Sequence, residues 1–215
     1  MHRHQPMNIY GPPGTSKILD HLIAACDIPQ ATGFSVPGQT LPHPRDFINS
    51  RDIQPGEILY IDDIRISCCE NTHYRPEDQF GKQGPISLSY RFDAPDRSMV
   101  FTGDTGPCLA LEEFAKNADL LVGELFDTEL VINRLRATNP DMSDHALLQM
   151  RQHFDEHHLT PEDLGQLASR AGVKKVVAVH IPFITKSAEE DAKYVSRILA
   201  KFSGSVTISE DLAAY

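Results

Sequence analysis

The chain has 215 residues, of which 40% are hydrophobic and 23% are charged, and its formal net charge at pH 7 is −10. This acidic balance disfavours a general nucleic-acid-binding protein, because Lys and Arg are needed to neutralise phosphates. No apolar run approaches the ~20 residues that a membrane-spanning helix needs, so no membrane partner is expected. The first six residues also lack the apolar core of a signal peptide. Length and composition predict a single globular domain over residues 1–215.

The N-terminal region is predicted to form a short strand, Met7–Tyr10, and a helix, Ile18–Ala25. The segment Gly11–Lys17 joins them and resembles a phosphate-binding P-loop, in which a glycine-rich turn connects a strand to a helix. Two positions depart from that motif: Ser16 replaces the second glycine, and Ile18 stands where Ser or Thr would bind Mg²⁺. We therefore interpret the segment as a proline-stiffened turn at a helix N-terminus, with a nucleotide-binding protein as the weaker alternative.

The middle of the chain is predicted to be rich in antiparallel strands. Residues 30–55 are rich in Pro, Gly and polar residues and are expected to form a long surface loop. The alternation in residues 57–69 predicts a long strand or a hairpin. Two further strands are predicted over residues 86–92 and 98–101, separated by a turn at residues 94–97.

The second half of the chain is predicted to alternate helices with buried strands. The expected helices cover residues 109–117, 128–136, 144–157 and 188–202, with a further helix beginning at Pro161, and the expected strands cover residues 119–124, 174–179 and 205–209. Thr160, Pro161 and Asp163 match the N-cap, N1 and N3 positions of a helix start. Ser187 is the expected N-cap of the last helix. Antiparallel strands followed by βα units predict a mixed α/β fold.

The four cysteines, Cys26, Cys68, Cys69 and Cys108, form no Cys-x-x-Cys pair. Cys68 and Cys69 are adjacent on a predicted strand and should point to opposite faces of the sheet. We interpret all four as core thiols in a reducing compartment, which favours a cytoplasmic protein.

Three potential metal ligands, His73, Asp104 and His180, each follow an apolar strand. Gly103 permits a tight turn before Asp104. If these strand ends line one edge of a sheet, the ligand atoms should lie within about 3–6 Å of one another. Two imidazoles and a carboxylate suit Zn²⁺, with Mn²⁺ or Fe as alternatives, and a carboxylate can bridge two ions. Such a site predicts hydrolysis as the chemistry.

The motifs around these residues resemble the metallo-β-lactamase superfamily, in the branch that contains ribonuclease Z and arylsulfatase-like hydrolases. The similar stretches cover nearly the whole chain and are residues 9–15, 71–74, 89–92, 100–107, 118–124, 158–163 and 176–180. The resemblance implies an α/β fold of the αββα sandwich type. It also implies a metal-dependent hydrolase that uses one or two Zn²⁺ ions.

The same resemblance implies a role for each candidate residue. Asp104 would bridge both metals, while His73 and His180 would each complete the ligand set of one ion. His158 occupies the position of a catalytic histidine that assists the leaving group and is not a metal ligand. His157 is the neighbouring alternative for that role.

The chain departs from the family pattern in one motif. The run His-x-His-x-Asp-His, which supplies most of the metal ligands in the superfamily, does not occur, and His2 and His4 are not followed by Asp-His. We therefore expect an N-terminally incomplete domain that binds Zn²⁺ weakly, with fewer than two equivalents.

The expected substrate is a small-molecule ester or phosphodiester, cleaved by a metal-activated hydroxide. Transfer RNA is the less favoured substrate because the chain is acidic and shows no clear equivalent of the Gly- and Pro-rich arm with which ribonuclease Z binds tRNA. A homodimer is compatible with the sequence. The main alternative function is a non-catalytic remnant that keeps the fold.

Overall fold

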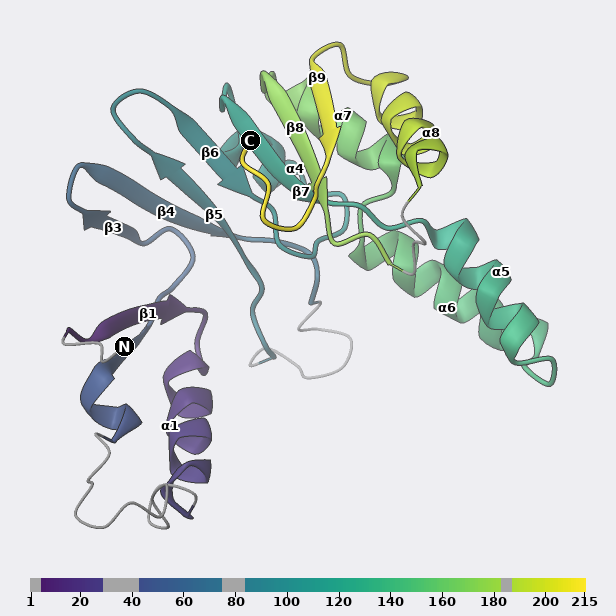
Figure 1. The fold of residues 1–215 in the computed structure, drawn as a ribbon. Coiled ribbons are helices and arrows are strands. Elements are labelled where there is room, and N and C mark those ends of the chain that lie inside the picture. Colours follow the sequence, from purple (N-terminus) through teal and green to yellow (C-terminus); the bar gives the residue numbers. More distant parts are fainter. Residues whose placement is uncertain (1–4, 29–42, 75–83, 183–186) are drawn as a thin grey trace. The chain divides into compact units, whose positions relative to one another are not determined.

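The computed structural model describes residues 5–28, 43–74, 84–182 and 187–215 (Figure 1). The chain divides into two compact units, Met1–Gln54 and Pro55–Tyr215. Within the described residues, no helix is both long enough and apolar enough to cross a membrane. All four cysteines are reduced thiols. Cys68 is buried, and Cys69 and Cys108 are partly buried against the hydrophobic core, but Cys26 is not part of that core, so the prediction of four core thiols is wrong for Cys26.

The first unit contains a two-stranded parallel sheet and two helical segments. Its elements are β1 (Met7–Gly11), α1 (Thr15–Ala25), the 3-10 helix η1 (Pro44–Phe47) and β2 (Ile48–Asp52). The prediction of a loop over residues 30–55 is wrong for η1 and β2, while residues 29–42 lie outside the described residues. The three central residues of β2 are polar and exposed. This strand is held by backbone pairing with β1, so it has no hydrophobic alternation that a sequence pattern could detect.

The P-loop-like turn binds a carboxylate of the chain itself. Asp52 accepts hydrogen bonds from the backbone N–H groups of Gly14, at 2.8 Å, and Ser16, at 2.7 Å. These two bonds lower the pKa of Asp52. An internal anion thus occupies the N-terminus of α1, where a bound phosphate would otherwise lie. This geometry favours the structural interpretation of the turn over nucleotide binding.

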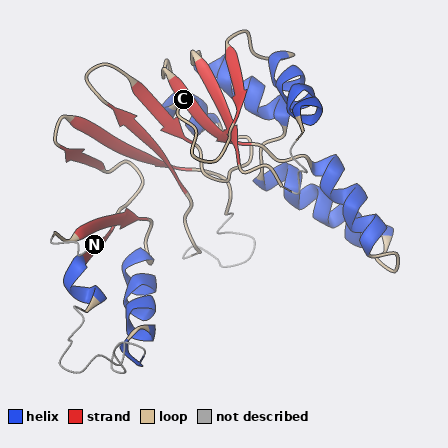
Figure 2. Ribbon diagram, in the orientation of Figure 1, coloured by secondary structure: helices blue, strands red, loops and turns tan. Residues whose placement is uncertain are grey.

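The second unit is built on one seven-stranded sheet with the order β3-β4-β5-β6-β7-β8-β9. The strands are β3 (Ile58–Ile61), β4 (Ile64–Glu70), β5 (Leu88–Asp93), β6 (Ser98–Phe101), β7 (Leu120–Glu124), β8 (Lys175–Val179) and β9 (Ser205–Ile208). Pairing is antiparallel from β3 to β6 and parallel from β6 to β9. This confirms the predicted order of antiparallel strands followed by βα units (Figure 2).

Five α-helices are described in this unit, in two groups. Helices α4 (Leu109–Phe114), α7 (Pro161–Ala171) and α8 (Ala188–Leu199) pack against the sheet. Helices α5 (Thr128–Thr138) and α6 (Asp144–His157) form a hairpin that extends away from the sheet (Figure 1). The predicted start of α7 is confirmed, because Thr160 and Asp163 form a reciprocal capping box.

The hydrophobic core lies between the sheet and the helices that cover it. Val100, Leu121 and Val176 are in register on neighbouring strands, and each is fully buried. Leu164 of α7 packs so closely on β7 that a Cβ at Gly123 would lie 2.5 Å from one of its methyl groups. This packing fixes the ends of β6, β7 and β8 relative to one another, and the candidate site lies beyond those ends.

Candidate metal centre

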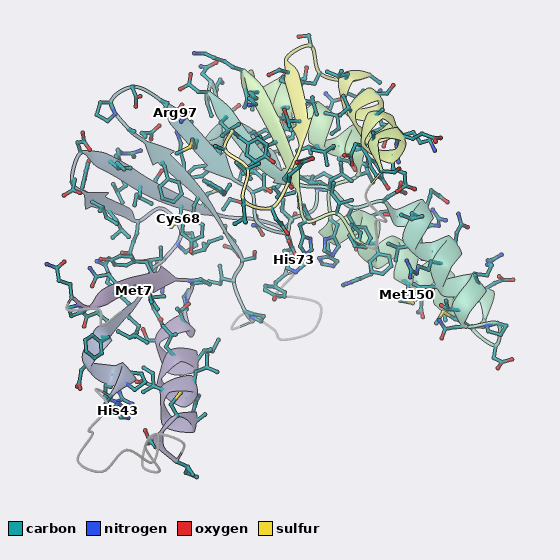
Figure 3. All side chains as sticks on the ribbon, viewed as in Figure 1. Met7, His43, Cys68, His73, Arg97 and Met150 are labelled. Carbon is teal, nitrogen blue, oxygen red and sulfur yellow. The ribbon has the colours of Figure 1, made fainter. Side chains whose placement is uncertain are left out.

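The sheet topology brings the candidate residues to one edge. β6, β7 and β8 are parallel, and β4 runs in the same direction as β6 because two antiparallel pairings separate them. His73, Asp104 and His180 follow β4, β6 and β8, so all three leave the sheet at its carboxyl edge. Figure 3 labels His73 at this edge, near α6.

Two groups of potential ligands lie at this edge among the described residues. One contains His73, Asp104 and His158, and the other contains Asp104, Glu124 and His180. In each group the ligand atoms lie within 4.8 Å of one another. Nδ1 of His180 is 3.5 Å from Oδ1 of Asp104 and 3.9 Å from Oε2 of Glu124. Asp104 is therefore common to both groups, which is the geometry expected of a bridging carboxylate.

The donor atoms fit a divalent transition metal. Imidazole nitrogens and carboxylate oxygens bind Zn²⁺ at about 2.0–2.2 Å, so two ligands of one ion lie at most about 4.4 Å apart. The 3.5 Å separation of His180 and Asp104 meets this limit, and the 4.8 Å bound on each group exceeds it only slightly. Small side-chain movements would complete either ligand set.

Two backbone conformations direct ligands into the site. Gly103 has a φ of 60°, which confirms the predicted tight turn before Asp104. His180 has a φ of 53°, a left-handed conformation that is unfavourable for a non-glycine residue. Strain of this kind is concentrated at functional sites. At the end of β8, this conformation places the His180 side chain beside Asp104.

Asn71 fixes the backbone of the loop that carries His73. Its side chain is buried and donates to the carbonyl of Thr102 at 3.0 Å. Its Oδ1 accepts a hydrogen bond from the N–H of His73 at 3.1 Å. The loops after β4 and β6 are therefore joined by a buried amide whose donor and acceptor are both used.

Glu124 is a site residue that the sequence analysis missed. It is the last residue of β7 and only 1% exposed. Its Oε1 accepts a hydrogen bond from the backbone N–H of Thr105 at 2.5 Å, and its Oε2 lies 2.8 Å from Nδ1 of His158. The available signal was the one used for Asp104, a carboxylate at the end of an apolar strand.

His158 belongs to the first ligand group and contacts Glu124 of the second. Its ring stacks on Phe126, with centroids 4.5 Å apart and an interplanar angle of 19°. Because the Glu124 carboxylate accepts from Nδ1, Nε2 remains available to the site. The alternative residue, His157, instead binds the backbone of Thr72 and is not a member of either ligand group.

Comparison with known proteins identifies the family. Residues 1–181 match the family described as "Beta-lactamase superfamily domain". The chain therefore belongs to the metallo-β-lactamase superfamily, as its motifs suggested, and its mixed α/β fold is the predicted one.

Several curated relatives carry the name ribonuclease Z, and two of them illustrate the similarity. The protein from Mycobacterium avium (strain 104) is 26% identical over 208 residues, which are 96% of this chain and 66% of the relative. A putative ribonuclease Z from Mycobacterium tuberculosis (strain CDC 1551 / Oshkosh) is 25% identical over 213 residues, 96% of this chain and 82% of the relative. The chain thus spans just under two thirds of the length of the first relative.

Solved structures show the same fold at low identity. The metallo-beta-lactamase fold protein YhfI from Bacillus subtilis superposes with a TM-score of 0.59 and 16% identity, over 94% of this chain and 62% of that one. The short form of human tRNase Z superposes with a TM-score of 0.51 and 14% identity, over 98% of this chain and 68% of that one. At these identities the likeness concerns the fold alone.

Proposed function

We propose that this chain is a metal-dependent hydrolase of the metallo-β-lactamase superfamily that cleaves phosphodiester bonds. The observation that carries the proposal is the shared position of Asp104, whose carboxylate belongs to both ligand groups. A single carboxylate between two sets of donors is the arrangement used to hold one or two ions at a hydrolytic centre. The names of the curated relatives support the phosphodiester as the substrate class.

His73, Asp104 and His180 are the proposed ligands, with Zn²⁺ as the preferred metal and Mn²⁺ or Fe as alternatives. When bound, such an ion supplies positive charge that activates water and stabilises negative charge on the phosphate. Because the sequence contains no His-x-His-x-Asp-His run, we expect weak binding of fewer than two equivalents.

His158 and Glu124 are the proposed pair for proton transfer. Glu124 holds Nδ1 of His158, so Nε2 is the atom that would give a proton to the leaving oxygen. The buried Glu124 carboxylate accepts from Nδ1 and so holds the imidazole ring in one orientation. Phe126 stacks on the ring and fixes its plane.

An RNA substrate is a second candidate within the same chemistry, favoured by the names of the curated relatives. The formal net charge of −10 opposes it, because a nucleic acid would meet an acidic protein. A small phosphodiester carries less negative charge than RNA and is therefore the favoured substrate, with a small carboxylic ester as a further alternative.

The proposal is tested by metal analysis together with hydrolysis assays. Wild-type protein and Asp104→Asn are brought to equilibrium with Zn²⁺ by dialysis, their bound metal is measured at the same free Zn²⁺ concentration, and both are assayed in that buffer with bis(p-nitrophenyl) phosphate, p-nitrophenyl acetate and a precursor tRNA. We expect Asp104→Asn to lose metal and phosphodiesterase activity together, because one carboxylate serves both ligand groups. Asp141→Asn, an exposed carboxylate in the loop between α5 and α6, is the control and should retain both. Wild-type protein without metal or hydrolysis would instead support the non-catalytic alternative.

A further inference from the structure

The ring of His73 is held in one tautomer by a backbone group. Its Nδ1 lies 3.2 Å from the carbonyl oxygen of His157. A carbonyl can only accept, so Nδ1 must carry the hydrogen and Nε2 must present its lone pair. This is the tautomer that a histidine needs when Nε2 binds a metal, and a partner of this kind orients the ring.

The side chain of His157 forms a second hydrogen bond between the same two segments. Its own Nδ1 donates to the carbonyl oxygen of Thr72 at 3.2 Å. His157 is buried, and the carbonyl of Thr72 would lose this donor if the imidazole were removed. The end of α6 and the residues after β4 therefore exchange two hydrogen bonds, one from each histidine.

These two bonds are part of a longer series of hydrogen bonds around the site. The N–H of Thr72 donates to Oγ1 of Thr105 at 3.3 Å, and the N–H of Thr105 donates to Glu124. Glu124 binds His158, which is the neighbour of His157 in the chain. The series of hydrogen bonds therefore begins and ends at the C-terminus of α6.

A glycine shows how tightly this helix end is packed against the loop that carries Asp104. A Cβ placed on Gly106 would lie 1.8 Å from the carbonyl oxygen of Glu156. Any larger residue at position 106 must push the end of α6 away from the site. Close contact at this point is what keeps His157 within reach of Thr72.

We propose that His157 is a positioning residue, which fixes the tautomer and orientation of the ligand His73 through its bond to Thr72. The proposal rests on the proposed function for the metal role of His73, but the tautomer itself belongs to the metal-free protein. His153 provides a matched control, because it lies one turn earlier on α6, is exposed, and has its ring 4.5 Å from that of His157.

The first test is the tautomer of His73 in the metal-free protein, read by ¹⁵N-resolved NMR of the imidazoles. We expect the Nδ1–H form in wild-type protein and in His153→Ala. In His157→Phe, which keeps a ring of similar size but loses the donor, we expect a mixture of tautomers. In His157→Asn the amide replaces the Nδ1–H group, and the Nδ1–H form of His73 should be largely restored. A wild-type protein with His73 in the Nε2–H form would overturn the proposal.

The second test is zinc affinity, measured by competition with a chromophoric chelator. Partners of this kind change metal affinity by roughly 10–100-fold, so His157→Phe should bind Zn²⁺ weaker by that factor, with partial recovery in His157→Asn. His157→Leu, which also lacks the donor, should weaken binding in the same direction, and it serves as the second variant if His157→Phe does not fold. Equal affinity in wild-type protein and His157→Phe would refute the positioning role. If wild-type protein bound no zinc, the proposed function would fail, while the tautomers would still decide the role of His157.

Discussion

Substitution of His158 should lower turnover without removing metal, whereas substitution of a proposed ligand should lower both. General acid help is worth roughly 10²–10⁴-fold, so we expect His158→Ala to lower kcat by that factor and to retain most of the metal. The reason is geometric, since Nδ1 of His158 is committed to Glu124 while Asp104 is shared by both ligand groups. The measurements are steady-state kinetics and elemental analysis of the same samples.

The control for this prediction is His153→Ala, an exposed histidine on the same helix, which should leave kcat and metal content unchanged. A loss of metal in proportion to activity in His158→Ala would mean that His158 is a third ligand beside His73 and Asp104. That outcome would contradict its assignment as a proton donor.

His73, Asp104 and His180 could be selected as candidate ligands from the sequence because each follows the end of an apolar strand, and their role as ligands stays a prediction. Glu124 was missed because it is the last residue of its strand and was assigned to the buried run. Its burial becomes informative only when the hydrogen bonds to Thr105 and His158 are known. A sequence pattern contains no information about such long-range partners.

At the scale of elements, Asp119 joins the starts of three parallel strands at the edge opposite the site. Its carboxylate accepts hydrogen bonds from Lys174, at 2.6 Å, and from the backbone and hydroxyl of Ser98, at 2.7 and 3.0 Å. The Lys174 ammonium, followed by the two Ser98 groups, lowers the pKa of Asp119 to about 2.

This shift predicts a pH-dependent loss of stability on Asp119→Asn. A carboxyl group with a lowered folded-state pKa stabilises the fold above its usual pKa near 3.8, and the effect disappears as the pH falls towards 2. We expect the variant to unfold at lower urea concentration than wild-type protein at pH 7, and the difference to shrink between pH 4 and pH 2.

The control for Asp119→Asn is a carboxylate that pairs only with a residue close to it in the chain. Glu113→Gln removes an exposed i,i+3 pair with Lys116 and should change the urea midpoint little at any pH. A pH-independent difference for Asp119→Asn would show that the amide disturbs the strand starts by its shape, and that the charge is irrelevant.

Elements were predictable where local chemistry determines them. The capping box at Thr160 and the N-cap at Ser187 gave the starts of α7 and α8, since the capping side chains lie within four residues of the groups they bind. β2 was not predictable, because it depends on pairing with β1, about forty residues away in the chain, and buries little of its own surface.

At the scale of the whole molecule, the family match extends over both compact units, since residues 1–181 include Met1–Gln54 and much of Pro55–Tyr215. A single domain over residues 1–215 stays a prediction. All five residues of the two ligand groups belong to the second unit. Metal binding should therefore stabilise that unit directly.

This coupling predicts that a chelator lowers the thermal stability of the zinc-loaded protein. A ligand present at 100 times its Kd stabilises the native state by about 2.7 kcal/mol. For a unit of this size, each kcal/mol corresponds to about 2–4 °C, so we expect EDTA to lower Tm by roughly 5–10 °C. Circular dichroism is the suitable probe because the chain contains no Trp.

Asp104→Asn should melt at the same temperature with and without EDTA, since it lacks the shared ligand. An equal EDTA effect in both proteins would place the stabilising metal elsewhere in the chain.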